Sequence, residues 1–139
     1  MDTDIVVGID GSEHADLALA WALDEAEVRG ARVRAVLTWS FFGQGDAGLG
    51  MGTHESDAAA ALDAVVQRVA GDRAALVDQV LVNDLPVAGL LDQASTGAMI
   101  VVGSRGVGGV KGLLLGSTSR SLVERANVPV VVVPHEQRS

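Results

Sequence analysis

The chain has 139 residues with 18 acidic and 10 basic side chains, a formal net charge of −8 and no cysteine. This length predicts one domain over residues 1–139, the acidic balance argues against a nucleic-acid partner, and the lack of cysteine excludes disulfides and thiolate metal sites. The apolar runs fall far short of the ~20 residues of a membrane-spanning helix, and the acidic first residues lack a secretory signal's basic region, so we expect a cytoplasmic protein without a membrane partner.

The first third of the chain alternates between strand and helix patterns. Ile5–Ile9 is a β-branched run typical of a strand buried on both faces. Residues 13–29 predict a helix with Ser12 as its N-cap and Gly30 as its stop, and residues 32–39 predict a second strand. The apolar stripe expected for the helix consists of Leu17, Trp21 and Val28, beside the small residues Ala18, Ala22 and Ala26.

The same alternation continues to the end of the chain. The expected segments are a glycine-rich loop at 40–54, a helix at 55–70, an edge strand at 76–82 interrupted by Asp78 and Gln79, a helix opened by Pro86, a strand at 98–102, a glycine-rich connection at 103–115, a helix at 116–126 and a strand at 128–133. This order predicts an α/β domain with a parallel sheet and helices on both faces. Ligands bind such sheets at the carboxyl ends of the strands where strand order reverses, which points to residues 10–12 and 103–119.

Residues 103–119 carry the strongest functional signal. Glycine permits positive φ and lets a ligand approach the backbone directly. Gly116 and Ser117 open a helix, whose free N–H groups and partial positive charge favour an anion. The segment also supplies the hydroxyls of Ser117, Thr118 and Ser119 and the cations Arg105 and Lys111. A surface loop with an ordinary N-cap explains any one of these residues, but the whole set predicts a site for a di- or triphosphate.

Other motifs do not fit the sequence. The P-loop pattern fails around Lys111, the dinucleotide fingerprint fails after the first strand, and no G-x-S-x-G elbow occurs. A zinc-protease pattern starts at His54 but has Ala58 where the second histidine is required. Because His14, His54 and His135 are far apart in the sequence, we expect all three to be solvated surface residues.

One spacing does match a known pattern: Gly103, two residues, Gly106, nine residues, Gly116 and then Ser117. With this motif, and with the flanking runs Val7–Ser12 and Val128–Val133, the chain resembles the universal stress protein family in its ATP-binding branch. The resemblance covers nearly the whole chain. It implies a Rossmann-like, five-stranded parallel sheet of order 3-2-1-4-5, with ATP lying across the ends of the first and fourth strands.

The resemblance also implies which residues contact the nucleotide. Asp10 would face a ribose hydroxyl or a nucleotide-bound Mg²⁺, because bare phosphate would repel its carboxylate; a turn role is the alternative. Gly8 would allow close approach of the adenosine, and Trp39 is expected to pack rather than stack. The predicted binding residues are Gly8, Asp10, Trp39, Val102, Gly103, Ser104, Arg105, Gly106, Val107, Gly108, Gly116, Ser117, Thr118 and Ser119.

The last strand is expected at a sheet edge, where Val130–Val133 is too apolar to stay bare. The resemblance implies a homodimer in which Val128–Val133 pairs with its copy. The alternative is a monomer whose edge is blunted by Pro134 and the polar tail.

The expected function is that of an ATP-binding regulatory protein of the stress response, because a phosphate site is present without an evident base or nucleophile. The alternative is a slow ATPase or autophosphorylating protein, with hydroxyls at Ser117–Ser119 near the terminal phosphate and Asp10 holding Mg²⁺. A phosphoacceptor response regulator is discounted because Pro134 and His135 stand where that class needs a lysine. The intact glycine pattern weakens a nucleotide-free scaffold.

Overall fold

The computed structural model describes residues 3–39, 54–105 and 115–135. The elements are β1 (Ile5–Ile9), α1 (Glu13–Arg29), β2 (Val33–Trp39), α2 (Glu55–Ala70), a 3₁₀ helix (Gly71–Leu76), β3 (Val77–Asn83), α3 (Pro86–Ala94), β4 (Met99–Gly103), α4 (Ser117–Arg125) and β5 (Val130–Val133). The strands form one five-stranded sheet in the order β3-β2-β1-β4-β5, and every neighbouring pair is parallel. The predicted α/β fold and strand order are therefore confirmed.

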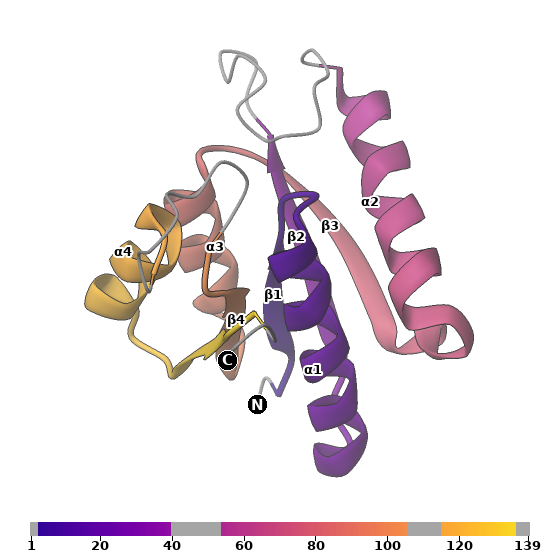
Figure 1. Cartoon of the computed structure of the whole chain (residues 1–139), viewed down its shortest axis with the longest axis horizontal. Coiled ribbons are helices and arrows are strands. Elements are labelled where there is room, and N and C mark those ends of the chain that lie inside the picture. The colour runs from indigo at the N-terminus through magenta and orange to yellow at the C-terminus, as the bar shows by residue number, and fades with distance from the viewer. Residues whose placement is uncertain (1–2, 40–53, 106–114, 136–139) are drawn as a thin grey trace.

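The sheet is covered on both faces, with α1 and α2 on one side and α3 and α4 on the other (Figure 1). Side chains alternate along a strand, so Ile5, Val7 and Ile9 of β1 pack with α1 and α2. Val6 points to the opposite face, toward α3 and α4. Burial on both faces explains why the inner strands read as continuous apolar runs.

Helix α1 begins and ends as predicted, but its buried face differs. Ser12 Oγ accepts a hydrogen bond from the Ala15 N–H at 3.1 Å, and Gly30 adopts φ 67° at the helix end. The buried residues are Ala15, Ala18, Leu19, Ala22, Leu23 and Ala26. The prediction that Leu17, Trp21 and Val28 form the buried stripe was wrong. Val28 is 83% exposed, and Leu17 and Trp21 are only half-buried. Alanine on this face brings the helix backbone close to the sheet.

The two edge strands are β3 and β5, as predicted. The expectation that Asp78 and Gln79 interrupt β3 was wrong, because the strand runs unbroken past both residues. Each is exposed at the edge, and Asp78 accepts two hydrogen bonds from the Arg32 guanidinium at 2.9 and 3.0 Å. The polar residues within β3 therefore indicate that it is an exposed edge strand, and they do not interrupt it.

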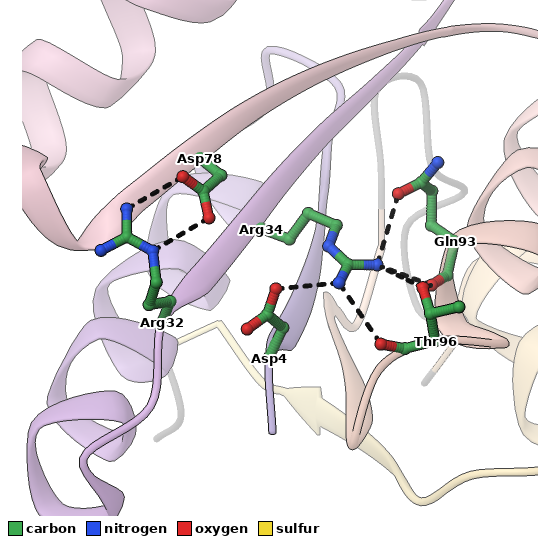
Figure 2. Close-up of polar contacts among 6 residues, drawn as sticks. All are labelled: Asp4, Arg32, Arg34, Asp78, Gln93 and Thr96. Atoms are coloured by element: carbon green, nitrogen blue, oxygen red, sulfur yellow. Dashed lines mark hydrogen bonds and ion pairs between the residues drawn. The ribbon is translucent and has the colours of Figure 1, made fainter. Parts of the chain in front are cut away.

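A hydrogen-bonded network closes the amino end of the sheet (Figure 2). Arg34 of β2 donates from Nη2 to Asp4 Oδ2 at 2.8 Å, and from Nη1 to the Gln93 carbonyl at 2.9 Å and Thr96 Oγ1 at 3.0 Å. The Arg34 side chain is only 13% exposed. The Arg34 guanidinium thus links β2 to the residue before β1 and to the end of α3 and the turn after it.

Candidate functional site at the carboxyl end of the sheet

The ends of β1 and β4 lie side by side because these strands pair in parallel register. The chain leaves β1 at Asp10 and leaves β4 at Ser104. The Gly116 N–H donates to the Ser104 carbonyl at 2.7 Å, so the start of α4 is held against the end of β4. The structure therefore brings together three of the predicted segments, at 10–12, 103–105 and 116–118. Gly106, Val107 and Gly108, with Lys111, lie outside the described residues.

Asp10 forms a tight turn between β1 and α1. Its Oδ1 accepts hydrogen bonds from the Ser12 N–H at 2.9 Å and the Ser12 hydroxyl at 2.6 Å. Gly11, between them, has φ 86°, a conformation that favours glycine. Asp10 therefore stabilises this turn, which is the alternative role that the sequence suggested for it.

Two of the predicted glycines lie in close contact with other parts of the protein. A Cβ on Gly103 would lie 2.6 Å from both the Cβ and the carbonyl oxygen of His14, in the first turn of α1. A Cβ on Gly8 would lie 3.0 Å from Leu90 Cδ1. Positive φ does not explain Gly103, since the described glycines with positive φ are Gly11, Gly30 and Gly71. At Gly103 the absent side chain makes room for α1, and at Gly8 the space is taken by Leu90.

Val102 and Trp39 have their side chains in the core. Val102 is 5% exposed and packs with α3 and α4. Trp39, at the end of β2, packs against the core beneath α1 and α2, which confirms the expected packing role. A ligand would therefore meet Val102 through its main chain.

The three predicted hydroxyls at the start of α4 differ in exposure. Ser117 is exposed and Thr118 is half-buried, whereas Ser119 is 3% exposed. Ser119 Oγ donates toward the Ser104 carbonyl at 3.0 Å and the Gly116 carbonyl at 3.2 Å. Ser117 and Thr118 thus lie at the helix end as expected. Ser119 is turned to the main chain, because helical geometry points successive side chains in different directions.

The structure brings two distant histidines together beside this site. The rings of His14 and His135 have centroids 4.8 Å apart, and His135 Nε2 lies 3.5 Å from Glu13 Oε1. Burial lowers the pKa of His14, and the charges of His135 and Arg105 act in the same direction. Within the described part of the chain, His14 Nδ1 is buried without a hydrogen-bond partner.

The expectation of three solvated histidines was therefore wrong for His14 and His135, while His54 is exposed as predicted. One signal was available in the sequence. His14 follows the first strand of a parallel sheet and His135 follows the last, so both fall at the carboxyl end. Only the strand order shows that β4 alone separates their strands.

In residues 3–39, 54–105 and 115–135, no group of three or more histidine or acidic side chains is arranged to hold a metal ion. Over the same ranges, no helix combines the length and apolar character needed to cross a membrane.

Comparison with known proteins agrees with the predicted fold and with the family that the sequence resembles. Residues 1–134 match the model of the universal stress protein family. A universal stress protein of Mycobacterium tuberculosis strain H37Rv is 38% identical over 133 residues, covering 92% of this chain and 44% of the relative. The chain thus spans about half the length of this curated relative.

Two solved structures are similar over almost their full length. The universal stress protein UspA from Lactobacillus plantarum has a TM-score of 0.75 at 25% identity, covering 94% of this chain and 97% of the other. A universal stress protein from Archaeoglobus fulgidus, solved in complex with dAMP, has a TM-score of 0.71 at 25% identity with the same coverage. On these matches, the chain belongs to the universal stress protein family.

Proposed function

We propose that this chain binds ATP at the carboxyl end of its sheet and acts as a nucleotide-dependent regulatory protein of the stress response. The observation that carries the proposal is the bond from the Gly116 N–H to the Ser104 carbonyl, which holds the amino end of α4 beside the ends of β1 and β4. The relative solved with dAMP supports an adenine nucleotide as the ligand class.

The triphosphate is assigned to the start of α4. The unpaired N–H groups of a helix's first turn and its partial positive charge favour an anion there. The exposed hydroxyl of Ser117 and the half-buried one of Thr118 lie at this end, and Arg105 adds a positive charge beyond β4. These groups offset the formal net charge of −8, which by itself would repel a polyphosphate.

ATP is expected to bind at least tenfold more tightly than AMP, because only ATP extends additional phosphates to the helix end. This ratio corresponds to about 1.4 kcal/mol. Isothermal titration calorimetry at one fixed ionic strength measures both affinities, with adenosine as the ligand without phosphate. Equal affinities for the three ligands would contradict the placement of the phosphates.

Asp10 is proposed to face the ribose or a Mg²⁺ ion carried by the nucleotide. Its carboxylate oxygens suit Mg²⁺, which commonly binds through one or two carboxylates together with substrate phosphates. Mg²⁺ would neutralise phosphate charge next to the Asp10 carboxylate, which bare phosphate would repel. The turn fixes this carboxylate through Ser12.

Asp10→Asn is expected to weaken MgATP binding about tenfold without unfolding the protein. An asparagine Oδ1 can still accept the bonds from the Ser12 N–H and hydroxyl, so the turn is kept while the charge is lost. Asp10→Ala loses the charge and the turn bonds, and should also lower the unfolding midpoint. Calorimetry with circular dichroism measures the two effects, and wild-type affinity in the Asn variant would remove Asp10 from the site.

A second candidate function, a slow ATPase or autophosphorylating protein, is favoured by the exposed Ser117 hydroxyl at the proposed phosphate end. Mass spectrometry of the intact protein after incubation with MgATP tests it. A covalently bound phosphoryl group that is absent in Ser117→Ala would support autophosphorylation at this hydroxyl.

We further propose a homodimer formed along β5. The four valines of this edge strand are all half-buried, and an exposed edge offers unpaired main-chain groups to a second strand. Pairing with a copy would cover both the apolar side chains and these groups. A cytoplasmic location is part of this proposal.

Val132→Pro is expected to convert the dimer into a monomer. The Ile100 N–H donates to the Pro129 carbonyl, and the Ser104 N–H donates to the Val133 carbonyl. Main-chain groups of alternate residues face the neighbouring strand in a parallel pair, so those of Val132, between Val131 and Val133, point away from β4. Proline there removes an outward N–H and is tolerated on an edge strand. Sedimentation velocity at tens of micromolar compares the variant with wild type, and a monomeric wild type would contradict the dimer.

A further inference from the structure

We propose that Ser119 is a positioning residue that fixes the entry and exit of the glycine-rich segment. It acts through Ser104, where the chain leaves β4, and through Gly116, where it enters α4. The inference rests on the proposed function in one respect: the start of α4, at Gly116, is where the phosphates are proposed to bind.

Burial first singles out this pair of serines. Within the described part of the chain, the buried polar residues are Ser104 at 9% exposure and Ser119 at 3%. Both lie at the junction of β4 and α4. Burying a hydroxyl is unfavourable unless it is hydrogen-bonded, and alanine would fill a small buried site without that cost. A serine here therefore requires a reason beyond packing.

The hydrogen bonds supply that reason. Ser119 Oγ lies 3.0 Å from the Ser104 carbonyl oxygen and 3.2 Å from the Gly116 carbonyl oxygen. The same Ser104 oxygen accepts the Gly116 N–H at 2.7 Å. A carbonyl oxygen has two lone pairs, and Ser104 uses both on groups from the far end of the segment. We name these three contacts the serine clasp.

The clasp is also fastened to the sheet. The Ser104 N–H donates to the Val133 carbonyl at 3.0 Å, so the peptide groups on both sides of Ser104 are hydrogen-bonded. Gly116 is thereby held relative to β4 and β5 before any ligand arrives. Ordering main chain at the moment of binding costs affinity, and a prearranged site avoids that cost. The clasp therefore prearranges the helix end at which the phosphates are proposed to bind.

The test compares Ser119→Ala with Ser121→Ala, which makes the same substitution two residues along α4. The first readout needs no nucleotide: the hydrogen exchange rate of the Gly116 amide, measured by NMR. Removing one hydrogen bond of the clasp should accelerate this exchange about five- to tenfold in Ser119→Ala and leave it unchanged in Ser121→Ala. The second readout is calorimetric affinity for ATP and for adenosine.

We expect Ser119→Ala to bind ATP about tenfold more weakly and adenosine within twofold of wild type, because the clasp serves the phosphate end. A residue with only a general structural role would lower both affinities together. If wild type binds ATP and Ser119→Ala binds it equally tightly, the positioning role of Ser119 is overturned while the proposed function stands. Absence of ATP binding in wild type overturns the proposed function, and the Gly116 exchange rate then still decides whether the clasp exists.

Discussion

Gly103→Ala is expected to destabilise the protein by about 3 kcal/mol, at the upper end of what overpacking usually costs. A Cβ at this position would lie 2.6 Å from the His14 carbonyl oxygen and 2.7 Å from its carbonyl carbon. These are main-chain atoms of the first turn of α1, which the turn at Asp10 fastens to β1. The helix cannot give way without disturbing that turn. Urea unfolding followed by circular dichroism measures the loss.

Gly8→Ala is the matched control, at the equivalent end of the neighbouring strand. Its new Cβ would meet the ends of two side chains, Leu90 Cδ1 at 3.0 Å and Val102 Cγ1 at 3.4 Å. Because a leucine side chain can shift by a few tenths of an ångström, the cost should be about 1 kcal/mol. Equal stability of the two variants would show that α1 does not require glycine at position 103.

Arg34→Met is expected to cost about 2–3 kcal/mol, because it removes a donor on which several acceptors depend. Methionine replaces the apolar stem of arginine but leaves the Asp4 carboxylate and the Gln93 and Thr96 carbonyls without their shared donor. The Arg34 side chain is 13% exposed, so water replaces these bonds poorly. The thermal midpoint should fall by several degrees while nucleotide affinity is unchanged, since this network lies at the opposite end of the sheet.

Arg32→Met is the control for this network, and both arginines are visible in Figure 2. Arg32 also pairs with a carboxylate through two hydrogen bonds, but its side chain is 48% exposed and that of Asp78 is 49% exposed. An exposed ion pair adds little to stability. The thermal midpoint of Arg32→Met should therefore stay near that of wild type, and an equal fall in both variants would contradict the distinction drawn from burial.

The two ends of the sheet thus have different roles. The amino end is closed by side-chain hydrogen bonds around Arg34, which join elements far apart in the chain. At the carboxyl end the described hydrogen bonds of the junction run largely between main-chain groups, through Ser104, Gly116 and Val133. A main-chain junction next to a helix amino end is suited to an anion, whereas the Arg34 network already uses its cation internally.

Much of the fold was predictable from the sequence because its signals are local. The strand runs, the Ser12 cap and the Gly30 stop depend on neighbouring residues, and the structure confirms each of them. Alternation of strands and helices predicts a parallel α/β sheet on physical grounds. The spacing of Gly103, Gly106, Gly116 and Ser117 indicated the family, which the comparison with known proteins confirms, and it predicts a site at the carboxyl end of the sheet.

The tertiary structure decided what each of those residues does. Gly103 is required by the approach of α1, Ser119 turns inward to Ser104, and His14 meets His135, and only the packed structure shows these contacts. Contacts of this kind depend on the distance between elements after they pack, and a pattern read along one segment does not contain that distance. The sequence by itself determined the architecture, whereas packing determined which residues of the candidate site are exposed and which face the protein interior.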